Sequence, residues 1–375
     1  MKPEISIIIP VYNVRNYLKQ CVQSILRQSG MKDRYEILLI DDGSTDGSGQ
    51  LCDDFKIRYP VIRVIHQKNA GLGAARNTGI KNAAGDFLLF VDADDFICRN
   101  SLASILTEAV TYPADLYFLN SYKFFKNGNI TPLNDTNLQK INLLYNFSRN
   151  RNNSASAANL KKKKKNGSIA KTFTAGKTSW RHNIPVYKQE CMRELAGLSK
   201  YPGSACDKLV RRSMIQKHNL YFEENVFCED LIWVLKCILS AETYRYINTS
   251  YYYYRQERPD SISNRNNRKK IRDLTHVIKQ GIALSKKQIC SPYKKEIRSM
   301  MAYETEILLL FFGMLSRKER TSEQNTIKRI LWILNYRDTK RTRFIRLILK
   351  RFGIGTASQL LCLGYKLRQW RKNYE

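Results

Sequence analysis

The chain has 375 residues, of which 43% are hydrophobic, and a formal net charge of +31 at pH 7. This composition is typical of a globular protein with a real core and room for two domains. Nine scattered cysteines without a CxxC pair and four scattered histidines predict reduced thiols in a reducing compartment and no zinc site. The amino-terminal apolar run is too short for a signal peptide, and no run reaches the roughly 18 residues of a membrane span, so we expect a cytoplasmic protein.

The positive charge is concentrated after the first hundred residues. Residues 1–100 hold 13 Lys and Arg against 12 Asp and Glu. A large positive charge ordinarily indicates nucleic acid or an anionic membrane surface as the partner. Because the amino-terminal part is nearly neutral, we expect it to be an enzyme core and the remainder to carry the basic character.

Strand-like and helix-like segments alternate over the first 120 residues. Apolar runs typical of buried strands lie at residues 5–10, 37–40, 61–65, 86–92 and 112–120. Pro10 is expected to end the first of them. The alternation with helical segments predicts right-handed βαβ units, and therefore an α/β fold with a mostly parallel sheet flanked by helices.

Polar side chains follow four of these strands. They are Tyr12 and Asn13, Asp41 and Asp42, Asn69 with Arg76 further along, and Asp92 with Asp94. Ligands of parallel α/β sheets bind outside the carboxyl ends of the strands. Each group alone could be a satisfied turn, but four groups at one edge of a sheet favour a pocket.

Residues 86–95 read DFLLFVDADD, an apolar run that ends in three carboxylates. Asp92 and Asp94 could converge on a metal where the strand breaks into a turn. Oxygen ligands of this kind suit Mg²⁺ or Mn²⁺, completed by water and substrate phosphates. Alternatively, Asp94 or Asp95 could cap a helix expected at residues 101–110. The segment by itself leaves both interpretations open.

Two common nucleotide motifs are missing from the sequence. Residues 71–73 read GLG, which is not a GxGxxG fingerprint after the first strand, and no GxxxxGK[ST] loop occurs. This argues against a hydride-transfer enzyme and a P-loop NTPase. The remaining inventory of carboxylates and one arginine suits a nucleotide diphosphate carried as a leaving group.

Four motifs together identify a resemblance. They are PVYN at residues 10–13, DDGSTDGS at 41–48, NAGLGAARNTGI at 69–80 and GDFLLFVDADD at 85–95. In order and spacing these motifs resemble the family 2 glycosyltransferases of the GT-A fold. The similarity continues at residues 207–212, 227–230, 251–255 and 261–263, and so covers about residues 1–265 with one interruption.

The resemblance implies a role for each matched residue. Tyr12 and Asp41 would hold the nucleobase, with Pro10 in the same motif, and Asp42 or Asp92 would hold the ribose. Asp94 would contact the metal, Mn²⁺ or Mg²⁺, in a DxD motif whose first member is Asp92. Arg76 would lie near the base or the diphosphate, and Asn69 belongs to the same donor-side motif.

Asp230 would be the catalytic base. Transfer with inversion needs one carboxylate to take the proton of the attacking acceptor hydroxyl, while a metal neutralises the departing diphosphate. Glu229 and Asp230 precede an apolar helical run at residues 231–239. Carboxylates in a first helical turn are also favoured by the helix dipole alone, which is the alternative explanation.

The later part of the chain departs from the family pattern. Residues 146–180 shift to Asn, Ser, Lys and Gly, which predicts either a mobile insertion or a basic lid over an acceptor. Beyond the tyrosines at 251–254, Arg255 and Arg258 are donors suited to a diphosphate. The sequence RQER stands where processive members carry QxxRW, which favours addition of a single sugar.

The carboxyl-terminal residues read as basic helices. Residues 326–375 hold 13 Lys and Arg and 2 Asp and Glu. Phe344, Ile345, Ile348, Leu349 and Phe352 would share one helical face, with Arg343, Arg346 and Lys350 on another. This pattern favours attachment to an anionic membrane surface, and the alternative is an ordinary helix docked on the catalytic domain.

We therefore expect three regions, with a nucleotide-sugar-binding half at 1–115, an acceptor-binding and catalytic half at 116–265, and a basic helical region at 266–375. The predicted function is inverting transfer of one sugar, from a nucleotide-diphosphate sugar such as a UDP-sugar to a glycan or lipid-linked acceptor. The place would be the inner face of the cytoplasmic membrane, in surface polysaccharide or lipopolysaccharide synthesis. The alternatives are a nucleotidyltransferase and a basic nucleic-acid-binding protein. A nucleotidyltransferase would need a glycine-rich loop after the first strand, which this chain lacks. The acidic pocket predicts no nucleic acid partner.

Overall fold

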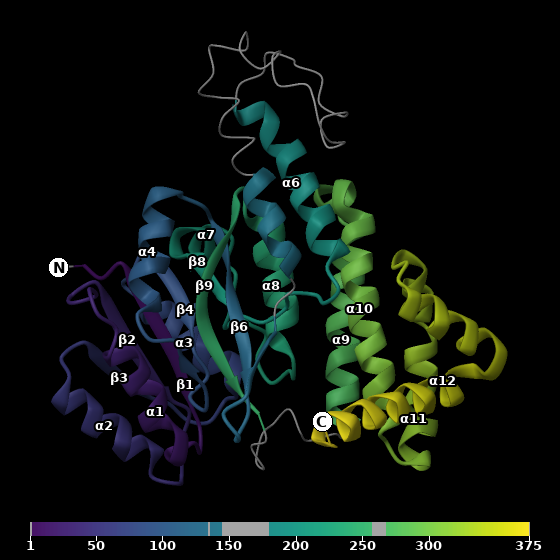
Figure 1. The fold of residues 1–375 in the computed structure, drawn as a ribbon, viewed down its shortest axis with the longest axis horizontal. Coiled ribbons are helices and arrows are strands. Elements are labelled where there is room, and N and C mark those ends of the chain that lie inside the picture. The colour runs from purple at the N-terminus through teal and green to yellow at the C-terminus, as the bar shows by residue number, and fades with distance from the viewer. Residues whose placement is uncertain (1, 134–135, 145–179, 257–267, 375) are drawn as a thin grey trace.

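The computed structural model describes residues 2–133, 136–144, 180–256 and 268–374 (Figure 1). The predicted insertion at 146–180 lies outside the described residues except at its last position. Arg258 and the matched residues 261–263 also lie outside them.

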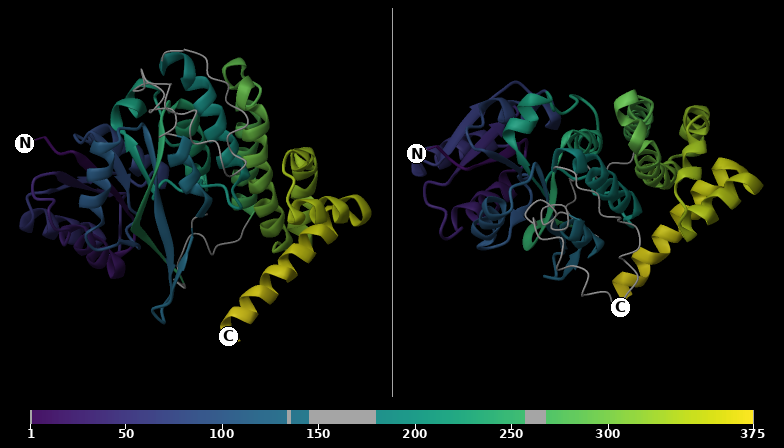
Figure 2. Two further views of the ribbon diagram at one scale, coloured as in Figure 1. Left: turned by 45° about the horizontal axis from the view of Figure 1, so that its top comes forward. Right: turned by 90° about the horizontal axis from the view of Figure 1, so that it is seen from above.

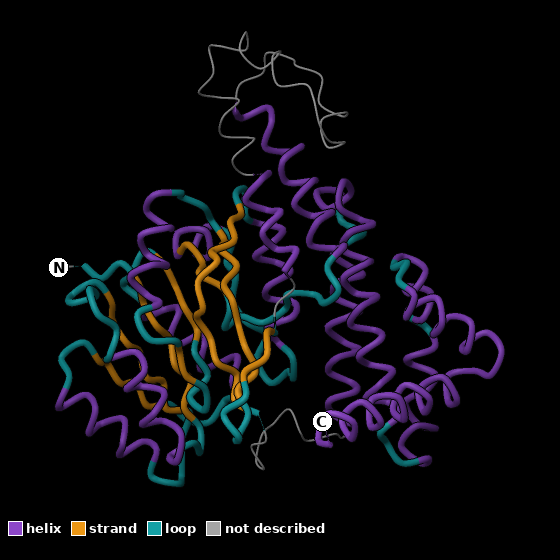
Figure 3. The backbone as a smooth tube through the Cα atoms, in the orientation of Figure 1, coloured by secondary structure: helices purple, strands orange, loops and turns teal. Residues whose placement is uncertain are grey.

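One nine-stranded sheet forms the centre of the fold, with helices on both faces (Figure 3). The strands follow the order β3-β2-β1-β4-β8-β6-β9-β5, with β7 paired to β6. Their bounds are β1 Ile5–Val11, β2 Tyr35–Asp41, β3 Ile62–His66, β4 Phe87–Phe90, β5 Phe96–Ile97, β6 Leu116–Phe124, β7 Ile130–Pro132, β8 Lys208–Arg211 and β9 Tyr244–Arg255. Strands β1 to β4 are parallel as predicted, whereas β8 runs antiparallel between β4 and β6. The chain therefore has the expected α/β architecture.

The first strands form because their sequences are apolar on both faces. Every residue of β1 and β2 is buried. The helices that cover them are α1 Arg15–Leu26, α2 Ser48–Arg58, α3 Leu72–Asn82 and α4 Ser101–Thr111. Helix α1 buries Leu18, Cys21, Val22 and Ile25, which recur at helical spacing along one face.

Pro10 does not end the first strand, contrary to the prediction. Strand β1 continues to Val11, and Pro10 is buried and paired with Ile40 of β2. Pro10 shares its side of the strand with Ile8, whose carbonyl accepts a hydrogen bond from Val91 of the neighbouring chain segment. Strand β4 pairs with β1 only as far as Ile8, so the missing N–H of Pro10 interrupts no ladder.

Helices predominate in the second half of the chain. They are α6 Trp180–Gly197, α7 Arg212–Lys217, α8 Glu229–Ser240, α9 Arg268–Leu284, α10 Lys294–Gly313, α11 Arg317–Lys328 and α12 Lys340–Tyr374, with short 3₁₀ helices η1 Thr136–Gln139, η4 Gln288–Tyr293 and η5 Leu331–Tyr336. Helix α9 packs against α8, and α10 packs against α6, α9 and α12. Helix α12 kinks at Gly353, where φ is 76°, and its end stands clear of the other helices (Figure 2).

The apolar core is continuous across the three predicted regions. One buried cluster includes Ile7 of β1, Tyr117 of β6 and Ile278 of α9. The basic helical region is therefore joined to the sheet domain through shared core packing. The boundaries at 115 and 265 stay predictions about function. Within the described residues, no helix combines the length and apolar character that a membrane crossing requires.

Candidate active site

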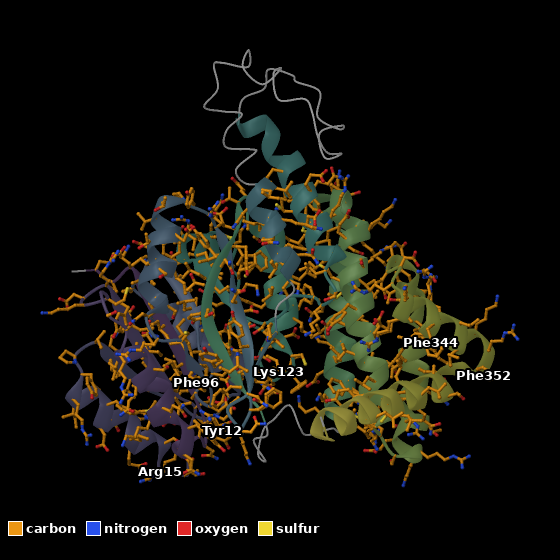
Figure 4. All side chains as sticks on the ribbon, in the orientation of Figure 1. Tyr12, Arg15, Phe96, Lys123, Phe344 and Phe352 are labelled. Carbon is orange, nitrogen blue, oxygen red and sulfur yellow. The ribbon has the colours of Figure 1, made fainter. Side chains whose placement is uncertain are left out.

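The strand ends that were predicted to form a pocket meet at one edge of the sheet. Val11 lies opposite Asp41, and Asp41 lies opposite His66, so β1, β2 and β3 end side by side. Strand β4 ends next to them at Phe90, directly before the acidic turn. Tyr12, at the end of β1, is 48% exposed and lies near this edge in Figure 4. Its contact with a nucleobase stays a prediction.

Asp41 is held by a histidine that the sequence analysis did not single out. One carboxylate oxygen of Asp41 accepts a hydrogen bond from the Ser44 amide at 3.0 Å, and the other lies 2.8 Å from Nδ1 of His66. The second ring nitrogen of His66 lies 3.1 Å from Asp53. The hydrogen bonds to Asp41 and Asp53 raise the pKa of His66. His66 therefore orients the carboxylate that was predicted to hold the nucleobase.

Asp42 is occupied by the chain that leads into α3. Its carboxylate accepts hydrogen bonds from the Gln67 side chain at 2.7 Å and from the amides of Ala70 and Gly71 at 3.0 and 2.8 Å. Gly71 has φ 89° and ψ 166°, a conformation that only glycine adopts easily. Asp42 is also buried, so it shapes this loop. The assignment of the ribose to Asp42 or Asp92 stays a prediction.

Asn69 lies in the same loop and is exposed at the sheet edge. A contact between its side chain and a nucleotide stays a prediction.

The carboxylates of the acidic turn after β4 differ in their exposure. Asp92 and Asp94 are partly exposed, whereas Ala93 and Asp95 between and after them are buried. Asp95 accepts hydrogen bonds from the Tyr252 hydroxyl and from the Arg255 amide, so it anchors the turn to β9. Burial, followed by the charges of Asp94 and Asp92, raises the pKa of Asp95.

The helix-cap alternative for these carboxylates is wrong. Helix α4 begins at Ser101, and the residue at its cap position is Asn100. Asp94 and Asp95 lie too far before it to cap it.

Arg255 lies against the same turn. Its Nε donates to the Asp94 carbonyl at 2.8 Å, and its Nη2 donates to the Gln20 side chain at 2.7 Å. The guanidinium also packs 5.3 Å from the ring centres of Tyr17 and Phe96. Arg255 is therefore fixed beside the acidic turn, and its contact with a diphosphate stays a prediction.

Arg76 joins the acidic turn to the first turn of α8. One guanidinium nitrogen donates to Glu229 at 2.5 Å and another to Asp92 at 2.8 Å. The residue is only 2% exposed and packs 5.2 Å from the Phe222 ring centre. Burial alone would lower the pKa of Arg76, but the two carboxylates raise it well above its ordinary value. Direct binding of a nucleotide stays a prediction, and the observed contacts make Arg76 a link between two acidic segments.

The two carboxylates at the start of α8 have different surroundings. Glu229 is buried against Arg76, and burial raises its pKa to about 7. Asp230 is partly exposed, and burial raises its pKa to about 6, with the charge of Arg76 opposing and that of Asp92 adding to the shift. A carboxyl group with a pKa near neutrality can both accept and release a proton at working pH. Because Glu229 is buried against Arg76 whereas Asp230 is partly exposed, Asp230 is the better candidate of the two for a base, and this role stays a prediction.

Part of the chain matches a known protein family. Residues 6–183 match the family model described as glycosyl transferase family 2. The chain therefore carries a glycosyl transferase family 2 domain. The motif resemblance found in the sequence is confirmed.

The curated relatives of this chain include bacterial glycosyltransferases. The chain is 30% identical over 266 residues to the uncharacterized glycosyltransferase EpsJ of Bacillus subtilis, an alignment that covers 70% of this chain and 64% of EpsJ. It is 46% identical over 104 residues to the minor teichoic acid biosynthesis protein GgaA of Bacillus subtilis, covering 27% of this chain and 23% of GgaA. Alignments with the first curated relatives span 17% to 64% of the relatives' own lengths.

A solved structure shares the fold over nearly the whole family 2 chain. The crystal structure of S. aureus TarS 1-349 in complex with UDP-GlcNAc superimposes with a TM-score of 0.62 at 17% identity. The match covers 98% of this chain and 92% of that one. The similarity therefore extends through the carboxyl-terminal helices and confirms the predicted GT-A fold with a helical extension.

The donor atoms of this glycosyltransferase at the acidic turn fit a hard cation. Asp92 and Asp94 are both partly exposed on this turn, and one oxygen of Asp92 accepts a hydrogen bond from Arg76. Among the described residues, no group of three or more His, Cys, Asp or Glu side chains is arranged to hold a metal ion. A cation at Asp92 and Asp94 would thus be completed by phosphate oxygens and water, which is the usual environment of Mg²⁺.

Replacing Arg76 by lysine should lower the free energy of unfolding by about 1–3 kcal/mol, because one ammonium cannot serve both carboxylates and leaves a buried group without its donor. Urea denaturation measures the change. Arg34→Lys is the matched control, since Arg34 pairs with Glu4 at the surface and should change stability by less than about 1 kcal/mol. Equal changes in the two variants would show that the buried Arg76 bridge stabilises the fold no more than the surface pair does.

Proposed function

We propose that this protein moves a single sugar from a UDP-sugar to a glycan or lipid-linked acceptor, with inversion, during surface polysaccharide synthesis. The contacts of Arg76 support this most directly, since its guanidinium donates both to Asp92 of the acidic turn and to Glu229, the neighbour of the base candidate Asp230. TarS binds UDP-GlcNAc and GgaA acts in teichoic acid synthesis, which supports a UDP-sugar donor and a surface polymer as acceptor.

The proposed reaction uses the acidic residues of the site. Asp230 takes the proton of the acceptor hydroxyl while that oxygen forms a bond to the anomeric carbon. The bond between the anomeric carbon and the diphosphate oxygen breaks on the opposite face, and the electron pair leaves with the nucleotide. Asp92 and Asp94 would hold Mn²⁺ or Mg²⁺, which supplies positive charge for the departing diphosphate. Arg255 lies at the same turn and adds a fixed cation.

A panel of nucleotide sugars tests the proposal. With Mn²⁺ present, one UDP-sugar should raise the melting temperature and release UDP slowly by hydrolysis, and faster when acceptor is added. A chain that no nucleotide sugar stabilises, with or without Mn²⁺, would contradict the proposed activity.

We also propose that α12 holds the enzyme on the inner face of an anionic cytoplasmic membrane. The predicted apolar face is divided in the structure, because Ile345 is buried in the core while Phe344 and Phe352 are 54% and 62% exposed. Both exposed rings lie on the far side of the helical region from Tyr12 (Figure 4). With Leu347, also exposed, they define the α12 apolar patch. Exposed Lys350 and Arg351 beside it suit anionic lipid.

Serine at Phe344, Leu347 and Phe352 together should weaken binding to vesicles of anionic lipid by about tenfold or more, since each inserted apolar side chain contributes roughly 1.5–3 kcal/mol when fully buried. Vesicle sedimentation measures the partition. Serine at Ile57 and Val110, which are exposed on α2 and α4 to a similar or greater extent, is the control. Unchanged partition of the patch variant would leave α12 as a docking helix. Point variants are preferable to truncation, because Ile333 and Ile345 belong to the core.

A further inference from the structure

Helix α9 contacts the segment that leads into the two carboxylates of α8. This lead-in segment comprises residues 223–228. The carboxylate of Asp273 accepts a hydrogen bond from the Phe227 amide at 2.9 Å. Lys269 donates to the Asn225 carbonyl at 2.9 Å and also pairs with Asp273. Two adjacent turns of α9 therefore hold two backbone groups of the lead-in segment.

A further contact fixes the other end of the lead-in segment. The ring of His276 lies 2.7 Å from the carboxylate of Glu223, which also accepts a hydrogen bond from Gln280. On the opposite side, the Glu223 carbonyl approaches Gly73 so closely that a Cβ there would lie 2.5 Å from it. The lead-in segment is thus enclosed between α9 and the first turn of α3.

The backbone of the lead-in segment is unfavourable without such contacts. Asn225 has φ 61° and Cys228 has φ 62°, both in the left-handed region. Asparagine tolerates this conformation, but cysteine does so poorly, and such residues persist where their surroundings enforce them. Cys228 is the residue directly before α8, so its conformation sets the direction in which Glu229 and Asp230 enter the helix.

We propose that Asp273 is a positioning residue for Asp230. It holds the Phe227 amide, and with Lys269 it maintains the left-handed turn that aims Asp230 toward the acceptor side of the site. The inference rests on the proposed function of Asp230 as base. It gives the basic carboxyl-terminal region a part in the chemistry in addition to its proposed place on a membrane.

The test compares Asp273→Ala, Asp273→Asn and Glu323→Gln in the full-length chain. Asparagine keeps a carbonyl oxygen that can accept from the Phe227 amide, whereas alanine removes the acceptor. Glu323 is the control, because it pairs with Arg268 and Arg272 of the same helix and anchors α11 rather than the lead-in segment. The measurements are kcat, the donor KM, the melting temperature and amide exchange over residues 224–231.

Asp273→Ala should lower kcat by about 10- to 100-fold, as expected for a displaced reactive group, while the donor KM changes by less than about twofold. Exchange over residues 224–231 should become faster. Asp273→Asn should recover most of kcat, and Glu323→Gln should resemble wild type in kcat and in exchange.

A kcat in Asp273→Ala equal to that of Glu323→Gln would overturn the proposal, as would a failure of asparagine to restore kcat. If the alanine variant does not fold, the comparison of Asp273→Asn with Glu323→Gln decides, because faster exchange or a kcat loss above about tenfold in the asparagine variant would contradict a role for the acceptor oxygen. If wild type releases no nucleotide from any UDP-sugar, the proposed function fails. Amide exchange then still decides whether Asp273 holds the segment, since unchanged exchange in the alanine variant would overturn that contact.

Discussion

Replacing Asp230 by asparagine should reduce kcat by about 10²–10⁴-fold, the usual contribution of a positioned base. Donor binding should stay close to wild type, because the nucleotide is proposed to contact Tyr12, Asp41 and the acidic turn. The side-chain amide is nearly the same size as the carboxylate, so the fold should persist. Initial rates at varied donor concentration separate kcat from KM, and a thermal melt checks folding.

Asp86→Asn is the matched control for Asp230→Asn. Asp86 precedes β4 at the opposite edge of the sheet and pairs with Lys2 at the surface. Its substitution should leave kcat and KM unchanged. If Asp230→Asn kept full activity, or lost donor binding and turnover equally, Asp230 would have a structural role.

The dependence of kcat/KM on pH tests the role of Asp230 independently. Asp230 works as a base only when it is deprotonated, and burial raises its pKa to about 6. Among the charged groups that act on it are Arg76, Asp92 and Asp207, and its own charge acts on Glu229 beside it and on Glu304 of α10. Values of kcat/KM should therefore rise with pH up to about 6 and level off above it. Asp230→Asn should remove this acid limb.

Replacing Asp94 by asparagine should reduce Mn²⁺-dependent transfer by about 10²-fold or more, because charge neutralisation of the leaving group contributes several kcal/mol. Asp94 is partly exposed at a turn that is anchored by Asp95, so the protein should stay folded. Removing divalent cations from the wild type with EDTA should produce a comparable loss, and added Mn²⁺ should restore it. The variant should not recover at the Mn²⁺ concentration that restores wild type. Full activity of the variant would exclude Asp94 from the mechanism.

The strands, and the sheet edge at which they end, could be predicted from the sequence because both depend on local patterns. Runs buried on both faces mark the strands, and parallel strands bring their carboxyl ends to one edge, so Tyr12, Asp41 and Asp92 were placed correctly at that edge. Pro10 was misjudged because its tolerance depends on how far β4 extends along β1. His66 was missed because only the register of β2 against β3 places it beside Asp41.

Contacts between distant parts of the chain could not be predicted from the sequence. Arg76 and Glu229 are 153 residues apart, and nothing local indicates that they pair. The assignment of Asp42 likewise depends on where the loop before α3 lies. The apolar face of α12 was recognised, but its division into buried Ile345 and exposed Phe344 depends on the path of the helix against the core.

The shared guanidinium of Arg76 makes substitutions in the two acidic segments interdependent. Neutralising Asp92 would free more of the positive charge for the α8 carboxylates and remove a negative neighbour of Asp230, and both effects make Asp230 a weaker base. Residues that share a network of this kind do not contribute additively. Replacing either acidic segment by that of a relative should therefore preserve activity only when both segments are replaced together.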